Sequence, residues 1–254
     1  MIRIESINNK TVKNIASLKQ KKYRDKTGLF IAEGERNVRD GALKQTPEAI
    51  FVSDGFGGDI EYPCDIYSVT KEVFEKISDT GTPQGILGVF KKKTVDINSF
   101  SDENILILNG VSDPGNAGTL MRTALAFGYS SVIADRGCAD LYGTKSVRAA
   151  MSAVFGLKIC ISDNLTEDLK ILKEKGYHIY CADMDGKDIR KTDFEFPLGV
   201  IVGNEANGVD GDVISLSEKK VSIPMNKEME SLNAAVAGSL VMYDSTRKII
   251  GCKL

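Results

Sequence analysis

The chain has 254 residues, of which 42% are hydrophobic and 27% are charged, and its formal net charge is −2. This length allows two modest domains, and the lack of an apolar leader or a membrane-length run predicts a globular protein of the cytoplasm. The five cysteines are scattered and the single histidine, His178, lies in a strand-like stretch, so we expect no disulfide framework, no metal site and a structural role for His178.

Residues 1–94 are predicted to form a small α/β domain. The domain begins with a basic stretch, since residues 1–30 carry eight Lys or Arg against two acids. Such a stretch is either a solvated face or an electrostatic footprint for a phosphate backbone. Apolar periodicity predicts a helix over 12–24, a strand over 29–32, a helix over 35–43, a strand over 49–52, a helix over 71–77 and a strand over 86–90.

A polar segment that begins at Lys91 separates this domain from a second one, residues 102–254. The second domain alternates strands and helices, which predicts a mostly parallel sheet with helices on both faces. The predicted strands are 105–108, 131–134, 157–161, 178–182, 198–202 and 221–223, and the predicted helices are 117–127, 144–154, 167–174, 209–215 and 231–248.

Three loops rich in Gly, Asn and Pro follow strands of this sheet, over 110–116, 203–208 and 224–230. Ligands of open α/β sheets bind where loops leave the carboxyl ends of the strands, so we expect the functional site there. The loops contain neither a Gly-x-Gly-x-x-Gly pattern nor a Walker loop. This disfavours a standard dinucleotide or nucleoside-triphosphate enzyme.

The run from Asn109 to Gly128 predicts a turn followed by a helix. Asp113-Pro114-Gly115 has the chemistry of a type II turn, and Asn116 is placed to cap the helix over 117–127. Arg122 is the one charged residue of that helix, whose face opposite the apolar stripe is otherwise uncharged. We therefore expect the helix to be covered on both sides and Arg122 to be functional; the alternative is a solvated arginine packed by its stem.

A second uncharged helix is predicted from Ser231 to about residue 248. Residues 231–243 contain no charge, and this stretch is too short and too polar to span a membrane, so we expect it to be buried on nearly all sides. Two nearly uncharged helices in one small domain predict a subunit interface, most simply that of a two-fold homodimer.

Three segments of the second domain carry a resemblance to a known family. They are the run from Asn116 to Thr123, the run from Val202 to Gly208, and Ile223-Pro224-Met225 followed by Ser231-Leu232-Asn233. In this order they resemble the three signature motifs of the SpoU (TrmH-like) branch of the SPOUT methyltransferases, over the whole second domain. The first domain, with Thr82-Pro83-Gln84-Gly85, is similar to the substrate-binding domain often fused in front of it.

The resemblance implies an α/β fold with a trefoil-knotted, mostly parallel sheet, S-adenosyl-L-methionine as cofactor, a homodimer, and RNA rather than DNA or a membrane as partner. The reaction that it implies is methylation of a ribose 2′-hydroxyl, and the front domain favours large-subunit ribosomal RNA. It assigns catalysis to Asn116, Arg122, Glu205, Ser231 and Asn233. It assigns cofactor contacts to Gly203, Ile223, Leu232 and Met225. The charge pattern adds candidate RNA-phosphate ligands at Lys19, Lys21, Lys22, Arg24, Lys145 and Arg148.

The role of Arg122 has two versions. A guanidinium stays protonated across the usual pH range, so Arg122 is either a base formed transiently on desolvation or a cation that grips a phosphate and stabilises a developing alkoxide. Glu205, Asn116 and Asn233 would orient Arg122 or a substrate group. The structural alternatives are a polar turn residue for Glu205 and a helix cap for Ser231.

Other functions compete with this one. They are a transfer RNA substrate, methylation at a base, and a non-catalytic RNA-binding protein of ribosome assembly.

Overall fold

The computed structural model describes residues 1–226 and 228–250, with side chains up to residue 247. The chain forms two compact units. The first consists of Met1–Lys92 and Asp140–Phe155, and the second consists of Lys93–Ala139 and the residues from Gly156 onward.

The first unit contains a five-stranded mixed sheet. Its strands are β1 (Ile2–Ile4), β2 (Leu29–Glu33), β3 (Ala49–Ser53), β4 (Asp65–Val69) and β5 (Ile86–Lys91), and its helices are α1 (Lys10–Ser17), α2 (Lys21–Thr27), α3 (Glu35–Ala42), α4 (Lys71–Ile77), α6 (Thr144–Ala150) and most of α7 (Ala153–Gly156). The order is β1-β4-β3-β5-β2, with β5 antiparallel to both of its neighbours. Helices α1 and α4 pack on one face through Val12 and Phe74, and α3 packs on the other through Val38.

The basic helix predicted over 12–24 is wrong in its extent, because two helices share this stretch. The side chain of Asn9 caps α1 by accepting from the backbone N–H of Thr11 at 2.8 Å, and α1 ends at Ser17. Gln20 is extended, with ψ 133°, and α2 begins after it. Strands β1 and β4 were not predicted, because β1 has three residues and β4 includes the polar Asp65 and Ser68.

Residues 140–155 pack with the first unit, although they lie inside the predicted second domain. The rings of Tyr142 and Phe155 lie 4.9 Å and 5.6 Å from that of Phe30, and Phe155 meets Phe90 edge-on at 4.7 Å. The helix predicted over 144–154 is interrupted here. Helix α6 ends because Met151 has a φ of 53°, a left-handed conformation that a helix cannot continue through.

The second unit contains a six-stranded sheet in which all neighbours are parallel, as predicted. Its strand order is β11-β9-β10-β6-β7-β8. The strands are β6 (Asn104–Leu108), β7 (Tyr129–Asp135), β8 (Lys158–Ser162), β9 (His178–Asp188), β10 (Leu198–Val202) and β11 (Lys219–Ser222). The helices are η1 (Ile97–Ser99), α5 (Pro114–Ala126), α8 (Leu165–Glu174), η2 (Ile189–Lys191), α9 (Gly211–Ile214) and α10 (Ala234–Ile250).

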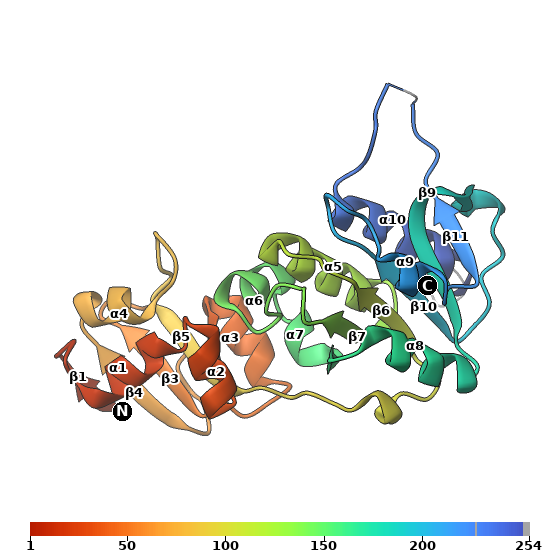
Figure 1. Ribbon diagram of the computed structural model, residues 1–254. Coiled ribbons are helices and arrows are strands. Elements are labelled where there is room, and N and C mark those ends of the chain that lie inside the picture. The colour runs from red at the N-terminus through yellow and green to blue at the C-terminus, as the bar shows by residue number, and fades with distance from the viewer. Residues whose placement is uncertain (227, 251–254) are drawn as a thin grey trace. The chain divides into compact units, whose positions relative to one another are not determined.

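Helices cover both faces of this sheet. Helices α8 and α9 pack on one face through Leu169 and Val213, against strand residues such as Ile107. On the other face α5 and α10 run side by side (Figure 1), joined by a hydrogen bond between the hydroxyls of Ser239 and Thr123 at 3.1 Å. As a result, the start of α5, the start of α10 and the loop after β10 lie close together at the carboxyl ends of the strands.

Two further observations concern the predictions for the whole chain. Within the described residues, no helix combines the length and the apolar character needed to cross a membrane. Cys252 lies outside the described residues, and the other four cysteines are free thiols.

Candidate active site

A short chain of hydrogen bonds joins the three sequence motifs at the carboxyl edge of the second unit's sheet. The Nδ2 of Asn116, at the start of α5, donates to Oε1 of Glu205 at 2.7 Å. The Oδ1 of Asn116 accepts from Nδ2 of Asn233, at the start of α10, at 3.1 Å. An amide, a carboxylate and a second amide, distant in sequence, therefore converge on one point.

The start of α5 explains why the Asn116 side chain is available for these bonds. Asp113, not Asn116, is the N-cap: its Oδ1 accepts from the backbone N–H of Asn116 at 2.7 Å, and Pro114 occupies the first helical turn. The predicted type II turn and the predicted capping role of Asn116 are therefore wrong. Asn116 lies within the first turn, and its side-chain amide is free to reach the other two motifs.

Asn204 shapes the loop that carries Glu205. Its Oδ1 accepts from the backbone N–H groups of Ala206 and Asn207 at 2.9 Å and 3.1 Å, and its Nδ2 donates to the carbonyl of Gly110 at 2.7 Å. One side chain thus closes the loop after β10 and ties it to the loop after β6. Asn204 was not predicted as a site residue, although its place in a turn-forming Asn-Glu-Ala-Asn-Gly run was a usable signal.

Asn233 has a second role as the cap of α10. Its Oδ1 accepts from the backbone N–H groups of Ala235 and Val236 at 2.9 Å and 3.2 Å. The alternative that Ser231 caps this helix is therefore wrong, and Ser231 lines a cavity instead. Because the cap fixes Oδ1, the amide of Asn233 presents its Nδ2 to Asn116 in one orientation.

That cavity lies between the loop after β10, the 223–232 segment and the start of α10. Its volume is about 480 Å³. All four predicted cofactor residues, Gly203, Ile223, Met225 and Leu232, line it, together with Glu205 and Ser231. Much of the remaining wall is apolar, from Val202 and Val221 to Val241. The wall thus combines an apolar surface with a carboxylate at the end of the Asn116 hydrogen-bond chain.

Gly203 lines this cavity at a position that has no room for a side chain. A Cβ at this position would lie 2.4–2.5 Å from backbone atoms of Gly208 and Val209, where there is no room for one. The two ends of the loop approach each other this closely because Asn204 and Gly208 exchange backbone hydrogen bonds of 2.8 Å and 2.9 Å. Their closeness leaves the backbone of residue 203 facing the cavity.

Arg122 is not part of the hydrogen-bond chain. Its side chain is exposed, and within residues 1–226 and 228–247 no hydrogen bond or ion pair is formed by it. The prediction that α5 is covered on both sides is therefore not met within one chain. Leu125 on α5 and Leu240 and Tyr243 on α10 are also exposed, at 38%, 40% and 52%. An uncovered apolar face thus runs along both helices beside Arg122.

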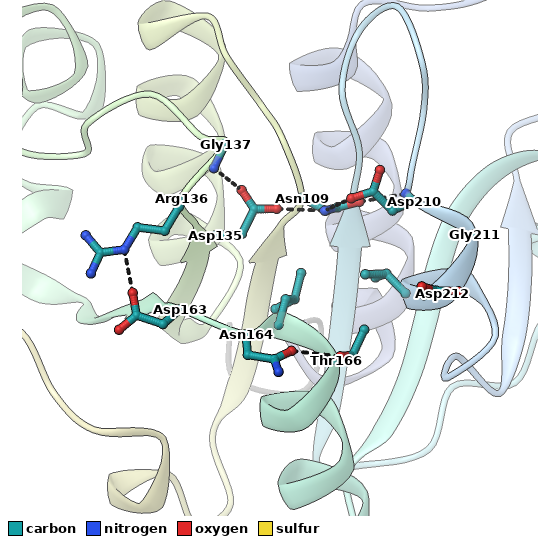
Figure 2. Close-up of a pocket in the computed structure, with 12 residues that line it drawn as sticks. Asn109, Asp135, Arg136, Gly137, Asp163, Asn164, Thr166, Asp210, Gly211 and Asp212 are labelled. Atoms are coloured by element: carbon teal, nitrogen blue, oxygen red, sulfur yellow. Dashed lines mark hydrogen bonds and ion pairs between the residues drawn. The ribbon is translucent and has the colours of Figure 1, made fainter.

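A larger cavity of about 610 Å³ is lined by residues that follow β6, β7 and β8 and by the start of α9 (Figure 2). Asn109 bridges two of the acids that line it, since its Nδ2 donates to Asp135 at 2.7 Å and to Asp210 at 2.9 Å. Arg136 pairs with Asp163 at 2.5 Å. These contacts connect the strand ends, and the clustered carboxylates disfavour an RNA phosphate. The smaller cavity is therefore the candidate active site.

All six candidate RNA-phosphate ligands lie in the first unit. Lys19 is partly buried, and its Nζ donates to the carbonyl of Lys76 at 2.9 Å; burial lowers its pKa. The exposed candidates are Lys21, Lys22, Lys145 and Arg148. Lys145 and Arg148 belong to this unit because α6 does, although the helix over 144–154 was predicted to lie in the second domain.

Arg24 contradicts its predicted role. It is 4% exposed, and its Nε and Nη2 donate to Oδ2 of Asp140 at 2.9 Å and 2.6 Å. Its Nη1 donates to the carbonyl of Leu18 at 2.6 Å. The guanidinium is thus enclosed in a buried ion pair that anchors residue 140, and it offers no face to a phosphate.

Comparison with known proteins links this geometry to one family. Residues 103–243 match the model of the SpoU rRNA Methylase family, and residues 9–88 match that of the MRM3-like substrate binding domain. The chain is 32% identical, over 96% of its length and 98% of the other, to the 23S rRNA (guanosine(2553)-2'-O)-methyltransferase RlmP of Bacillus subtilis. It is 28% identical to the human mitochondrial rRNA methyltransferase 3, covering 92% of this chain and 71% of the other. The AdoMet-bound rRNA methyltransferase of Sinorhizobium meliloti has a similar structure, with a TM-score of 0.87, 27% identity, and coverage of 97% and 98%.

Proposed function

This chain belongs to the SpoU rRNA Methylase family, and we propose that it transfers a methyl group from S-adenosylmethionine to a ribose 2′-hydroxyl of large-subunit ribosomal RNA. The observation that carries the proposal is the convergence of Asn116, Glu205 and Asn233 beside a cavity of about 480 Å³. The relative from Bacillus subtilis is named for 2′-O-methylation of a guanosine in 23S rRNA, which supports the choice of RNA.

The cavity suits the proposed cofactor in size and in chemistry. Small-molecule sites have volumes of roughly 300–1,000 Å³ and mostly apolar walls with a few placed polar groups. Ile223 and Leu232 offer apolar surface for an adenosine, while Asp183 and Glu205 bring negative charge that favours a sulfonium cation. When bound, S-adenosylmethionine supplies a methyl group on a positively charged sulfur, so no further activation of the methyl is needed.

The residues of this chain then have to orient the acceptor hydroxyl and manage its proton. The carboxylate of Glu205 accepts a hydrogen bond from the ribose, and the bond from Asn116 fixes the direction of that carboxylate. As the new oxygen–carbon bond forms, the carbon–sulfur bond of the donor would break and leave a neutral thioether, and the O–H proton would pass to the Glu205 carboxylate that accepts it, or to Arg122 if that residue acts as the base. In this proposal Arg122 is the cation that stabilises the developing negative charge and binds the adjacent phosphate, once the exposed face of α5 is covered.

The cover for that face is a second copy of the chain in this proposal. Leu125, Val236, Leu240 and Tyr243 form an exposed apolar surface on α5 and α10, which water disfavours in a free monomer. A two-fold dimer through this surface would enclose Arg122 and complete each site from two protomers. Sedimentation velocity of the wild type and of Leu240→Glu tests this, and a monomeric wild type would refute it.

We also propose that the second unit of the chain forms the trefoil knot of the family and that the protein is located in the cytoplasm. Strand β11 lies at the edge of the sheet, but helix α10, which follows it in the chain, packs on α5 and on the central strand β10. This path is the one expected if the C-terminal segment passes through a loop formed by the preceding chain, as it does in a trefoil knot. Gly238 permits this close approach, since a Cβ there would lie 2.5 Å from Leu120 and 2.8 Å from Val202. The free thiols of Cys64 and Cys138 suit a reducing compartment.

Methylation of purified RNAs with labelled cofactor tests the activity. Large-subunit rRNA from cells that lack the enzyme should acquire one alkali-resistant ribose methylation, and transfer RNA should acquire none. Arg122→Ala should abolish the label, whereas Arg190→Ala, a matched exposed arginine that pairs with Asp188, should not. A shifted acidic limb in the pH–rate profile of Arg122→Lys would favour the base role of Arg122. Retained activity in Arg122→Ala would show that Arg122 is not catalytic. If calorimetry detected no binding of S-adenosylmethionine to the wild type, the result would favour a non-catalytic protein of ribosome assembly instead.

A further inference from the structure

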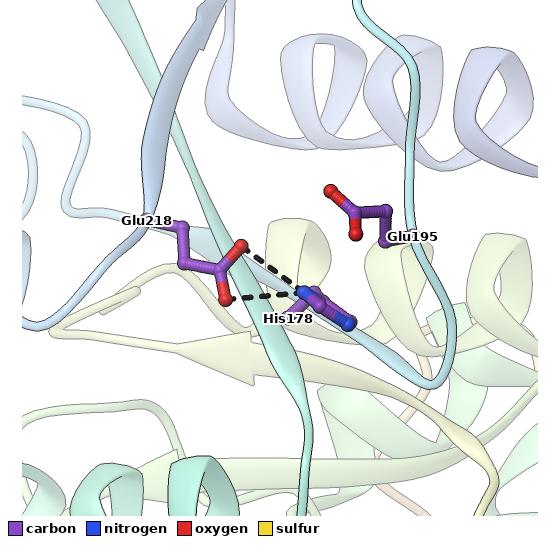
Figure 3. Close-up of side chains that lie close together, drawn as sticks. All are labelled: His178, Glu195 and Glu218. Atoms are coloured by element: carbon purple, nitrogen blue, oxygen red, sulfur yellow. Dashed lines mark hydrogen bonds and ion pairs between the residues drawn. The ribbon is translucent and has the colours of Figure 1, made fainter.

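His178, Glu195 and Glu218 form a cluster at the opposite edge of the second unit's sheet (Figure 3). The Nδ1 of His178, the first residue of β9, lies 3.1 Å from both carboxylate oxygens of Glu218. One ligand atom from each of the three residues lies within 4.8 Å of the others. We propose that these residues bind a divalent transition-metal ion, with zinc as the preferred ion.

The identity of the donors supports a metal of this class. An imidazole nitrogen with carboxylate oxygens is a borderline donor set, which suits zinc better than magnesium or calcium, since these take oxygen alone. Among the residues that the structure describes, this is the one group of three or more His, Cys, Asp or Glu side chains close enough to share an ion. Within the described residues, the one candidate metal centre therefore contains His178, the single histidine of the chain.

The backbone holds the two glutamates in place beside β9. The N–H of Glu218 donates to the carbonyl of Ile179 at 2.8 Å. The N–H of Glu195 donates to the hydroxyl of Tyr180 at 2.9 Å. The strand that begins with His178 thus anchors both of the other candidate ligands, so their backbones need no rearrangement to bind an ion.

The distances are compatible with coordination. Two donors at about 2.1 Å from zinc, at an angle somewhat above 90°, are separated by about 3.1 Å, which matches His178 and Glu218. Glu195, whose ligand atom lies within 4.8 Å of the others, has to move closer by at most about 1.4 Å to reach the tetrahedral spacing of about 3.4 Å. Its side chain is 58% exposed and therefore has the freedom to do so, and water can supply the fourth ligand.

Lys219 is the competitor for the ion. Its Nζ lies 3.5 Å from the carboxylate of Glu195, and both side chains are largely exposed, which makes this ion pair weak. With two carboxylates and one ammonium, the cluster retains a negative charge that attracts a cation. Removing the ammonium should therefore raise the affinity for metal, a result that a merely structural His–Glu contact does not predict.

The position of the cluster assigns the ion a structural role. His178 opens β9, and Glu195 precedes β10, so the cluster lies at the amino ends of these strands, whereas the candidate active site lies at their carboxyl ends. An ion here would tie the edge strand β11 and the 189–197 segment to β9. This proposal departs from the expectation, drawn from the sequence, of no metal site and a structural role for His178, because Glu218 is 40 residues from His178 and neither residue is part of a metal-binding motif.

Titration of the full chain with zinc chloride in a chelator-treated buffer tests the site. We expect one ion per chain by calorimetry, and a zinc-dependent rise in the melting temperature that does not depend on the methyl donor. His178→Gln and Glu218→Gln should each weaken binding by about tenfold or more. Lys219→Gln should strengthen it, and Glu167→Gln, an exposed acid outside the cluster, should leave it unchanged.

Two outcomes would overturn the proposal. One is zinc binding of equal affinity in the wild type and in both ligand variants, which would assign the ion to thiols elsewhere. The other is no binding to the folded wild type at millimolar zinc. Because both readouts are independent of methyl transfer, either result leaves the proposed enzymatic activity intact.

Discussion

Replacing Arg24 by methionine separates two roles that a basic residue in this stretch can have. A phosphate ligand contributes to RNA affinity and to its salt dependence, and little to stability. A buried ion-pair partner contributes to stability instead. Arg24 is 4% exposed, while Lys22, two residues earlier on α2, is exposed, so Lys22→Met is the matched control.

The contacts of Arg24 set the size of the effect. The variant loses two bonds to Oδ2 of Asp140 and one to the carbonyl of Leu18. Breaking a buried pair from one side costs about 3–5 kcal/mol, because the remaining charge stays unpaired. The lower end applies here, since the Asp140 side chain is 14% exposed and its Oδ1 keeps the backbone N–H of Tyr142 at 2.9 Å. Replacing both partners, as in Arg24→Met with Asp140→Leu, should recover about 2 kcal/mol of the loss.

Hydrogen exchange read by mass spectrometry measures this loss locally, which matters because two-unit chains rarely unfold in one step. Peptides that cover residues 140–155 should exchange about 100-fold faster in Arg24→Met, the equivalent of about 3 kcal/mol, and only about fivefold faster in the double variant. RNA affinity and its salt slope should fall in Lys22→Met instead. Unchanged exchange in Arg24→Met together with weaker RNA binding would refute the assignment of Arg24 to structure.

Three further changes test the site and the core. Asn204→Ala removes three hydrogen bonds that shape the loop after β10. Steady-state methylation should show that kcat/KM falls by about tenfold or more. Urea denaturation should show a loss of about 1–3 kcal/mol in the free energy of unfolding. Gly203→Ala should weaken S-adenosylmethionine binding in calorimetry, because its Cβ meets backbone atoms, whereas Gly211→Ala enters open space and should bind normally. Burial raises the pKa of Glu103, but the bond from Lys158 and backbone N–H groups outweigh it and hold that pKa at about 2. A depressed folded-state pKa stabilises the protein above the unfolded value of 4.5, and this contribution is lost as the pH falls toward about 2. We therefore expect Glu103→Gln to cost about 1–2 kcal/mol at neutral pH and to flatten the acid limb of a stability–pH profile, and an unchanged profile would contradict this.

Local patterns predicted the elements well wherever one segment determines its own conformation. The periodicity of 71–77 and 198–202 matches α4 and β10 residue for residue, because each buries a regular apolar face. The start of α5 was within reach of the sequence too: an acidic residue followed by proline is a known helix-start pattern, and Asp113-Pro114 was interpreted as a turn instead.

Other features depend on contacts between distant residues and could not be predicted from the sequence. The burial of Arg24 depends on Asp140, 116 residues later. The conformation of the loop around Glu205 depends on a hydrogen bond from Asn204 to the carbonyl of Gly110, which lies in the loop after another strand, β6. Arg122 shows the same limit in another form: the uncharged face of α5 predicts that this helix is covered, but the groups that surround Arg122 then depend on the covering surface.

The return of residues 140–155 to the first unit has a consequence for biosynthesis. The rings of Phe30 and Phe90 pack against Phe155, so this core is incomplete until that residue has left the ribosome. At about 5–20 residues per second, the wait after Phe90 lasts several seconds. During that time the nascent sheet presents aromatic side chains to solvent and to chaperones, and a fragment ending near residue 94 would remain in that condition permanently.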